Sequence, residues 1–281
     1  MVVFSSSNRL GYFILVFSLC VTGCYGEGKL SPNKERSLPL IIAHRGASYD
    51  APENTLQAFQ LAWEQEADGI EGDFFLTKDK EIVCFHDVNT KRITGVDLMV
   101  EDATLDELQA LDVGGWKGQE FVGIKMPTLQ DVIQTVPKGK KIIIELKSDE
   151  VIVPYLCKIL EDSDLDVDQI VVLSFNKSAI QRLEEVAPYY KTTWAVAFTK
   201  RLFGRVVPSP DQVLRTQRAM NCDGISTGRL YIPQGFSQKL ASKGIAHHVW
   251  TVNDLAEAQT FLELQSITTD IPEVLVKGLK Y

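Results

Sequence analysis

Two histidines and two carboxylates lie in one stretch of the chain, residues 41–87, and their types suggest acid/base chemistry beside a metal ion. His44 and His86 stand at the polar ends of apolar runs, and an imidazole can accept or donate a proton near neutral pH. Glu71 and Asp73 lie two residues apart, and side chains at that spacing share one face of a β-strand. This stretch therefore predicts two titratable imidazoles next to a same-face pair of carboxylates.

A third carboxylate belongs to the same prediction. Glu145 and Lys147 end the run KKIIIELK and also share one strand face. A carboxylate among isoleucine and leucine residues is costly to bury without a positive partner. Three converging carboxylates with few positive partners favour one hard divalent cation, Mg²⁺ or Ca²⁺, held by Glu71, Asp73 and Glu145. Internal ion pairs, Glu145 with Lys147 or Glu71 with Arg45, are the alternative.

Alternating strands and helices are expected to position these groups, as is typical of parallel β/α units. The expected strands are 40–43, 69–75, 81–85, 141–146, 170–174, 193–197, 224–227, 246–252 and 266–269, and the helices include 55–65, 128–136, 176–186 and 254–264. If segment 81–85 is an addition to the sheet, eight parallel strands remain, which predicts an α/β fold, a (β/α)₈ TIM barrel. The active site of such a barrel lies at the C-terminal ends of the strands, where these polar residues fall.

Segments 69–75 and 81–85 are expected to pair antiparallel, because the turn between them is too short for a parallel crossover. If the turn centres near Asp79, His86 lies opposite residue 72, between Glu71 and Asp73 on the neighbouring strand. Residues 88–127 then break the alternation. This insertion is rich in Gly and Asp, is expected to hold one short helix, 104–111, opened by a capping box, and could cover the mouth of the site.

The N-terminal residues are expected to lie outside the barrel domain, which we place at 39–281. Residues 11–22 form an apolar run too short to span a bilayer comfortably, and Val21-Thr22-Gly23-Cys24 resembles the lipobox of bacterial lipoproteins. We therefore expect a lipoprotein-type signal peptide at 1–23, lipidation of Cys24 and a polar tether at 24–38. Ordinary cleavage nearby and an uncleaved anchor are alternatives. The protein would be exported, and either anchored to a membrane through the lipid or periplasmic or extracellular.

Composition argues against several classes of protein. The chain has 281 residues, 45% hydrophobic and 23% charged, which is an ordinary globular composition. Of the five cysteines, Cys20 would leave with the signal peptide and Cys24 would carry lipid. The remaining three, Cys84, Cys157 and Cys222, cannot all pair, and the first two lie within apolar runs, so no disulfide framework is expected. The formal net charge is −8, and without a clustered basic face the chain would be a poor partner for nucleic acid. No protein partner is predicted.

Taken in order, the motifs of the chain resemble one family, the glycerophosphodiester phosphodiesterases, relatives of phosphatidylinositol-specific phospholipase C. The resemblance covers nearly the whole mature chain and is carried by His44-Arg45-Gly46, Pro52-Glu53-Asn54-Thr55, Glu71 with Asp73, His86-Asp87, Met126-Pro127-Thr128-Leu129, Glu145-Leu146-Lys147, Ser174-Phe175, Trp250-Thr251-Val252-Asn253 and Thr269-Asp270. It implies a barrel with a small insertion after the second histidine, and hydrolysis of glycerophosphodiesters to glycerol 3-phosphate and an alcohol.

The resemblance also implies roles for individual residues. Glu71, Asp73 and Glu145 would hold Mg²⁺ or Ca²⁺, and His44 and His86 would be the acid/base pair. Arg45 and Lys147 would neutralise the phosphate, Glu53 would lie at the edge of the site, and Trp250 would pack against the glycerol end. Two features depart from the family pattern: Gly72 stands where a larger residue is common, and residues 201–219 match nothing specific.

Other readings of the same residues remain open. A phosphodiester lyase of the sphingomyelinase D type would use a similar two-histidine, carboxylate-metal site on the same scaffold. A metal-dependent amidohydrolase would place other histidines where Arg45-Gly46 and Ser174-Phe175 stand. A non-catalytic lipoprotein that binds phosphodiesters is a further alternative, although both histidines and all three carboxylates are present. His247 and His248 are adjacent in an expected strand, so at most one faces the barrel, and structural or surface roles are expected for them.

Overall fold

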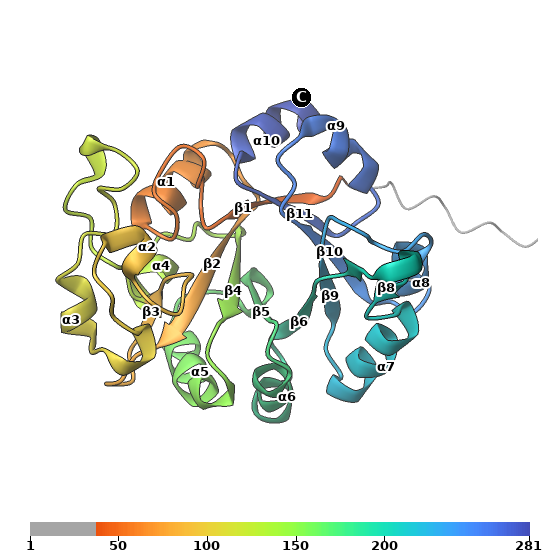
Figure 1. The fold of residues 1–281 in the computed structure, drawn as a ribbon, viewed down its shortest axis with the longest axis horizontal. Helices are drawn as coiled ribbons and strands as arrows, with labels where there is room; N and C mark the ends of the chain where they lie inside the picture. The colour runs from red at the N-terminus through yellow and green to blue at the C-terminus, as the bar shows by residue number, and fades with distance from the viewer. Residues whose placement is uncertain (1–37) are drawn as a thin grey trace, which may run out of the picture. The chain divides into compact units, whose positions relative to one another are not determined.

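Eight parallel strands close into a barrel that carries helices on its outside, which confirms the predicted (β/α)₈ fold (Figure 1). The computed structural model describes residues 38–281. The barrel strands are β1 (Leu40–His44), β2 (Gly69–Leu76), β4 (Lys141–Leu146), β5 (Ile170–Ser174), β6 (Lys191–Val196), β9 (Gly224–Gly228), β10 (Ala246–Trp250) and β11 (Ser266–Thr269). Strand β1 pairs with both β2 and β11, and these two pairings close the sheet. The predicted signal peptide, Cys24 and nearly all of the predicted tether lie outside the described residues.

Strand β3 (Ile82–Cys84) is the expected antiparallel addition beside β2. Phe74 pairs with Cys84 and Leu76 with Ile82, so the same register, continued by two residues, places His86 opposite residue 72 as predicted. Gly72 suits its surroundings, because a Cβ there would lie 3.1–3.2 Å from the Phe59 and Phe74 rings and the Cys84 sulfur. The absence of a side chain at this position lets β2 and β3 pack tightly against α1 (Leu56–Glu64).

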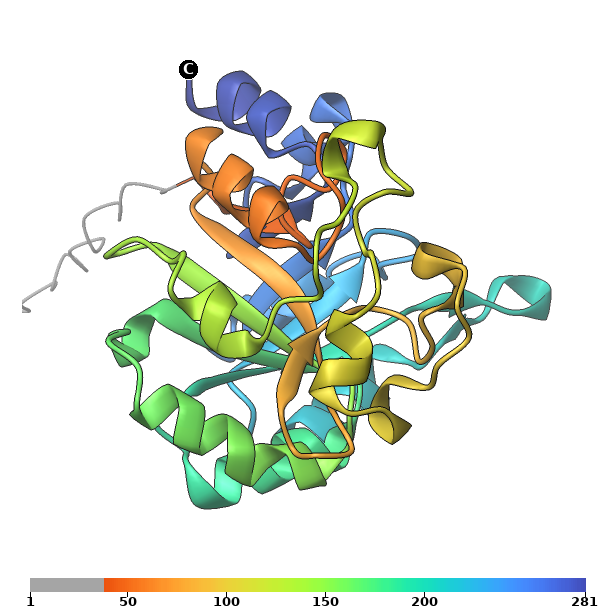
Figure 2. The ribbon, with the colours of Figure 1, turned by 90° about the vertical axis from the view of Figure 1, so that its left-hand side faces the viewer.

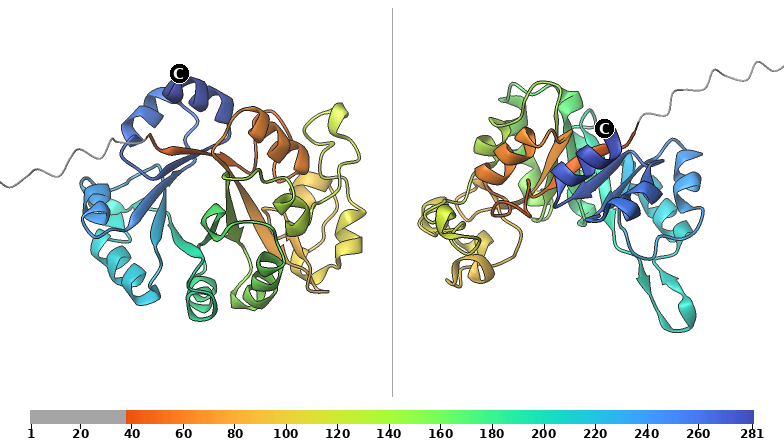
Figure 3. Two further views of the ribbon diagram at one scale, coloured as in Figure 1. Left: turned by 180° about the vertical axis from the view of Figure 1, so that it is seen from behind. Right: turned by 90° about the horizontal axis from the view of Figure 1, so that it is seen from above.

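The outer helices follow the strands as the hydrophobic periodicity predicts, with two differences. They are α1, α4 (Leu129–Ile133), α5 (Val153–Glu161), α6 (Lys177–Val186), α7 (Pro210–Met220), α8 (Phe236–Ala241), α9 (Leu255–Ala258) and α10 (Pro272–Lys280). Helix α4 is shorter than the expected 128–136. The expected helix 254–264 is instead α9 followed by a 3₁₀ turn, η6 (Gln259–Phe261). Figure 3 shows these helices around the strands from two further sides. Within the described residues, no helix is long and apolar enough to cross a membrane.

Buried aliphatic side chains between strands and helices hold the barrel together. Ile70, Ile142, Ile144 and Val172 belong to one cluster with apolar side chains of α1, α4, α5 and α6. Each of these isoleucines is fully buried, which contributes about 1.5–3 kcal/mol per side chain. The cysteines Cys84, Cys157 and Cys222 are free thiols, as predicted for this part of the chain.

The insertion at 88–127 contains more structure than the single helix expected from the sequence. It comprises α2 (Lys91–Thr94), η1 (Val100–Asp102), α3 (Leu105–Gln109) and η2 (Gln119–Phe121). The predicted capping box of Thr104 and Glu107 opens α3. Helix α2 is only one turn long, because Gly95 ends it with a φ of 75°, and so short an element leaves no periodic pattern. Apolar residues of the insertion pack on Phe75, Val83 and Phe85 of the β2–β3 hairpin, beside the barrel (Figure 2).

Candidate active site

A cavity of about 280 Å³ opens at the C-terminal ends of the strands and contains most of the predicted site residues. Its lining includes His44, Arg45, Glu71, His86, Glu145, Lys147, Phe175 and Trp250. A larger groove of about 890 Å³ lies between α4 and α5 on the outside of the barrel and contains none of these residues. The smaller cavity is therefore the candidate active site, in the position that a barrel of this type favours.

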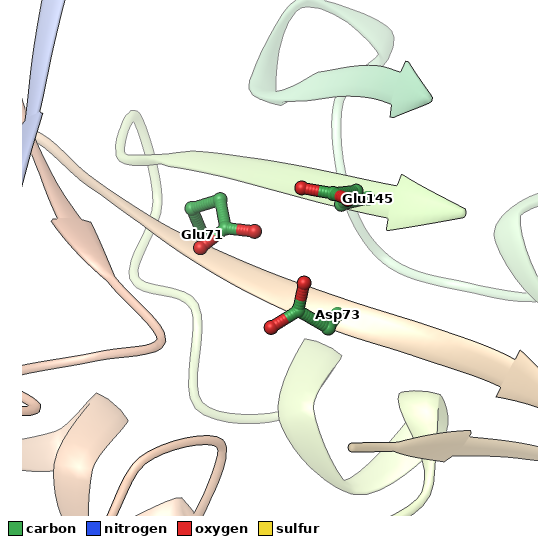
Figure 4. A group of neighbouring side chains, drawn as sticks. All are labelled: Glu71, Asp73 and Glu145. Atoms are coloured by element: carbon green, nitrogen blue, oxygen red, sulfur yellow. The ribbon is translucent and has the colours of Figure 1, made fainter. Parts of the chain in front are cut away.

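The three predicted metal ligands converge on one another (Figure 4), and two of them, Glu71 and Glu145, line this cavity. Glu71 and Asp73 come from β2 and Glu145 from β4, and the register of these strands pairs Asp73 with Glu145. Each of the three offers one carboxylate oxygen that lies within 4.8 Å of those of the other two. All three residues are buried, with exposed fractions of 2%, 1% and 8%. Oxygen ligands in this number and spacing suit a hard divalent cation.

Two cationic side chains neutralise only part of this charge. Lys147 Nζ lies 2.8 Å from Glu145 Oε1 and 3.1 Å from Asp73 Oδ1. Arg45 Nε lies 3.2 Å from Asp73 Oδ2, whereas Arg45 reaches Glu71 only through its backbone N–H, 3.0 Å from Oε2. The Glu145–Lys147 ion pair considered as an alternative is therefore present, and the Glu71–Arg45 side-chain pair is absent from the described part of the chain.

Glu71 provides the test of whether the site fits a cation. Its Oε1 is buried and has no hydrogen-bond partner. Burial, together with the negative charges of Asp73 and Glu145, raises the pKa of Glu71 to about 8. Burial and the charge of Asp73 also raise the pKa of Glu145, whereas Lys147 and Arg45 outweigh burial at Asp73 and lower its pKa. A buried carboxylate oxygen without a partner fits a bound cation, since a cation supplies the missing positive charge.

His44 ends β1 and is held by a carboxylate from the other end of the chain. Its Nδ1 lies 2.6 Å from Asp270 Oδ1, and Asp270 also accepts hydrogen bonds from Ser48 Oγ at 3.0 Å and Asn253 Nδ2 at 2.5 Å. Burial lowers the pKa of His44, but the hydrogen bond to Asp270 and the charge of Glu71 outweigh burial and raise it. The ring is thus oriented with Nε2 as its free nitrogen, and it gains a proton more readily than an ordinary histidine.

His86 follows β3 and is held in the same way by its neighbour. Its Nδ1 lies 2.7 Å from Asp87 Oδ1. Burial lowers the pKa of His86, and the charges of Arg45 and Lys147 lower it further, against the opposing charge of Asp73. The two imidazoles therefore differ: each is oriented by a carboxylate, but their pKa values are shifted in opposite directions.

A chain of charged side chains links His86 to the predicted phosphate-binding residue Arg45. Arg92 of α2 donates from Nε to Asp87 Oδ2 at 2.5 Å and from Nη2 to Glu53 Oε1 at 2.8 Å. Glu53 Oε1 also accepts a hydrogen bond of 2.9 Å from Arg45 Nη1. Glu53, predicted at the edge of the site, thus lies between two arginines, and these partners lower its pKa against the effect of burial.

Several residues of the site received no role from the sequence. Asn54 Nδ2 donates to Asp73 Oδ2 at 2.8 Å, and the Asn54 side chain also accepts from the Asp73 backbone N–H. Asn54, Asp87 and Asp270 lie inside the motifs that carry the family resemblance, so those motifs could have identified them. Arg92 lies in the irregular insertion, where neither motif nor periodicity distinguishes it from other exposed arginines.

Two aromatic side chains and one histidine form the far side of the cavity. Phe175 and Trp250 pack edge to face, with ring centroids 5.6 Å apart, and Trp250 Nε1 is buried without a partner. His248 lines the cavity and its Nδ1 lies 2.8 Å from Ser266 Oγ, whereas His247 lies 3.0 Å from both Thr227 Oγ1 and Ser237 Oγ. The expectation that at most one of the two adjacent histidines faces the barrel is confirmed.

Comparisons with known proteins agree with this geometry. A family model described as the glycerophosphoryl diester phosphodiesterase family matches residues 44–274. The chain is 35% identical over 247 residues to YhdW of Bacillus subtilis, a candidate glycerophosphodiester phosphodiesterase, covering 86% of this chain and 98% of YhdW. It is 32% identical over 247 residues to a glycerophosphodiester phosphodiesterase of Caldanaerobacter subterraneus, covering 84% of this chain and 96% of that protein.

Solved structures show the same likeness. A phosphodiesterase of Oleispira antarctica, solved in complex with the product sn-glycerol-3-phosphate, is similar with a TM-score of 0.78 and 28% identity, over 87% of this chain and 98% of that one. A glycerophosphodiester phosphodiesterase of Thermotoga maritima is similar with a TM-score of 0.69 and 26% identity, over 86% of this chain and 98% of that one.

Proposed function

The chain belongs to the glycerophosphoryl diester phosphodiesterase family and is a phosphoric diester hydrolase, and from this premise we propose that it cleaves glycerophosphodiesters to glycerol 3-phosphate and an alcohol by two-histidine acid/base catalysis. The observation that carries the mechanism is the pair of imidazoles, His44 and His86, at one cavity, each with Nδ1 bound to a carboxylate. This arrangement leaves both Nε2 atoms free for proton transfer to and from a substrate.

The charged groups around the histidines suit a phosphodiester. Mg²⁺ or Ca²⁺, held by Glu71, Asp73 and Glu145, would stabilise the negative charge that develops on the phosphoryl oxygens. Arg45 and Lys147 line the same cavity and would bind the phosphate as fixed positive charges. Because Lys147 and Arg45 are themselves held by Asp73, they stay in place when the substrate leaves. Trp250 would contact the glycerol end, and its unpartnered Nε1–H could donate to a glycerol oxygen.

The opposite pKa shifts support an assignment of the two roles. His44, with a raised pKa, would hold a proton and give it to the leaving alcohol. His86, with a lowered pKa, would be neutral and would take a proton from the nucleophile. Environments that separate the pKa values of two groups commonly separate acid from base. The nucleophile would be either the 2-hydroxyl of the substrate's glycerol, giving a cyclic phosphate that water opens, or water itself. The family resemblance favours the first.

The experiment compares leaving groups. The full chain, purified in detergent, is assayed on glycerophosphocholine and on the p-nitrophenyl ester of glycerol phosphate, with EDTA and then with Mg²⁺ or Ca²⁺ restored. p-Nitrophenolate leaves without a proton, so His44→Ala should lose much less activity on this ester than on glycerophosphocholine, while His86→Ala should lose equally on both. Activity unaffected by chelation would overturn the metal assignment, and full activity in either variant would overturn the acid/base pair.

Product analysis separates hydrolysis from the lyase alternative. We expect glycerol 3-phosphate as the final product in the assay with glycerophosphocholine. A stable cyclic phosphate with no release of glycerol 3-phosphate would instead indicate chemistry of the sphingomyelinase D type. If neither product forms although the substrate binds, the result would indicate a non-catalytic binding protein.

We also propose that the protein is exported and anchored by a lipid on Cys24. The support is the apolar run 11–22 followed by the sequence Val21-Thr22-Gly23-Cys24. Mass spectrometry of the mature N-terminus should find a diacylglyceryl group on Cys24 and no residues 1–23. A mature chain that begins elsewhere, or Cys24→Ser protein that is processed like the wild type, would contradict the proposal.

A further inference from the structure

A short hairpin extends from the rim that carries the active site. Strands β7 (Thr199–Lys200) and β8 (Val206–Val207) pair antiparallel directly after β6, at the C-terminal end of the barrel strands. The hairpin points away from the barrel in Figure 2 and in the right-hand view of Figure 3. Its tip and its second strand fall in region 201–219, to which neither the motifs nor the catalytic site assign a role.

The tip of the hairpin exposes two large apolar side chains. Leu202 is 79% exposed and Phe203 is 98% exposed, the largest exposed fraction among the large hydrophobic residues of the described chain. Phe203 also has a φ of 59°, in the left-handed region that bulky residues avoid, and Gly204 follows with a φ of 77°. Because Phe203 is almost fully exposed, it gains almost nothing from packing within the barrel domain. Its side chain would be stabilised only by an apolar surface outside the protein.

Three positive side chains surround this apolar tip. Lys200, Arg201 and Arg205 flank Leu202 and Phe203 in the sequence, within a chain of net charge −8. None of the three has a carboxylate within ion-pairing distance among the residues that the structure describes. An apolar tip ringed by free cations matches the interface of a bilayer, where acyl chains lie beneath negatively charged phosphates.

We propose that the hairpin of residues 199–207 docks on an anionic lipid surface, with Leu202 and Phe203 entering the bilayer interface and the three cations contacting lipid phosphates. A protein partner fits less well, because a protruding tip with two apolar side chains is far smaller than the roughly 800 Å² that each partner contributes to a stable interface. Nucleic acid would use the cations but would leave the apolar pair in water.

Lipid docking would place the active site close to the origin of its substrate class. Hairpin and cavity share one rim, and the exposed Phe175, Leu230 and Tyr231 lie in other loops of that rim. A glycerophosphodiester is what remains of a phospholipid after hydrolysis of both acyl esters, so an acyl-ester hydrolase acting on membranes must supply it. The docking itself does not rest on the proposed function, because it concerns a surface and not the catalytic groups.

The test uses the full chain and a probe at the tip. Residues 11–22 are apolar enough to bind vesicles themselves, so the amount of bound protein is not informative. Phe203→Trp places a tryptophan at the tip, and the signal of the four native tryptophans is subtracted with the wild type. The matched control is Tyr189→Trp, an aromatic residue that is 50% exposed and lies just before β6, at the opposite end of the barrel. Vesicles contain phosphatidylcholine and phosphatidylglycerol with brominated acyl chains, which quench tryptophan only on contact.

We expect quenching of the added tryptophan to be at least about fivefold greater at position 203 than at position 189, and weaker in vesicles of phosphatidylcholine alone. Arg201→Glu with Arg205→Glu, in the Phe203→Trp protein, should reduce the quenching to that of the control. Equal quenching at 203 and 189, or quenching unchanged by the two charge reversals, would overturn the proposal. Hydrolysis of glycerophosphocholine without vesicles should be unchanged in all these variants, which verifies their fold and separates this test from that of the catalytic function.

Discussion

Replacing Arg92 tests whether the insertion helps to build the catalytic site. Arg92 makes hydrogen bonds of 2.5 and 3.2 Å to Asp87 and of 2.8 and 3.2 Å to Glu53, and Asp87 in turn holds His86. Hydrogen bonds to charged groups contribute about 1.5–3 kcal/mol, but the Arg92 side chain is 46% exposed, and exposed ion pairs contribute about 1 kcal/mol or less. We therefore expect Arg92→Gln to cost about 1–2 kcal/mol in transition-state stabilisation, a roughly 5- to 30-fold fall in kcat/KM.

The fall in kcat/KM caused by Arg92→Gln should also depend on pH, and the direction of this dependence follows from the protonation of Asp87. Burial raises the pKa of Asp87, but the hydrogen bonds and positive charges of Arg92 and His86 together outweigh burial and lower it, and Arg92 makes the largest of these lowering contributions. Without Arg92 the Asp87 carboxyl takes up a proton at a higher pH, and a protonated Asp87 holds the His86 ring less well. The ratio of wild-type to variant kcat/KM should therefore increase as the pH falls through the acidic range in which Asp87 of the variant takes up its proton.

The assay is initial-rate hydrolysis of glycerophosphocholine across the pH range, with the divalent cation present in excess. Arg182→Gln is the matched control, because Arg182 is also 46% exposed and forms an ion pair, with Glu185, but lies on α6 away from the cavity. Arg92→Lys should recover part of the activity, since one ammonium group cannot bind both carboxylates as a guanidinium fork does. An Arg92→Gln loss no larger than that of the control, or one that is constant with pH, would refute the positioning role.

Three further outcomes follow from the buried charges. Asp270→Asn should lower the raised pKa of His44, so that the high-pH limb of the kcat profile moves to lower pH; an unchanged limb would contradict the acid role. Glu71→Gln removes a buried carboxylate whose pKa is about 8, so in EDTA at pH 8 the variant should have a higher Tm than the wild type in thermal unfolding. Adding Ca²⁺ should raise the Tm of the wild type but not that of the variant. Burial lowers the pKa of His247 and of His248 to about 4. Between pH 6.5 and 4 the unfolded chain therefore binds more protons than the native one, and the free energy of unfolding falls as the pH falls through this window. Urea unfolding should show this loss, and His247→Asn should reduce it by roughly half.

The fold could be predicted because it depends on patterns that are local in the sequence. Apolar runs of strand length and the short turn near Asp79 were enough to predict eight parallel strands, one antiparallel addition and the position of His86 opposite residue 72. The convergence of Glu71, Asp73 and Glu145 followed from period-two alternation in two strands. These inferences needed only the rule that parallel strands of a barrel present their C-terminal ends at one rim.

The hydrogen-bond partners of the histidines could not be predicted in the same way. The bond between His44 and Asp270 joins residues 226 positions apart, and it depends on the closure of β1 against β11. Arg92 reaches Glu53 across 39 positions from a helix of a single turn, which has no periodicity to detect. Such pairings depend on side-chain geometry after the barrel has closed, and several arginines of the chain would have fitted equally well from the sequence.

The insertion therefore has a different relation to the site than the sequence suggested. None of its described residues lines the cavity whose mouth it was expected to cover. Instead the insertion binds the loop between β1 and α1, because Lys117 Nζ donates hydrogen bonds to the carbonyl oxygens of Ser48 and Tyr49 at 2.8 and 2.7 Å. Ser48 Oγ in turn donates to the Asp270 carboxylate that orients His44. With Arg92 bound to Asp87, one insertion thus supports the carboxylate partner of each histidine, although none of its described residues lines the cavity.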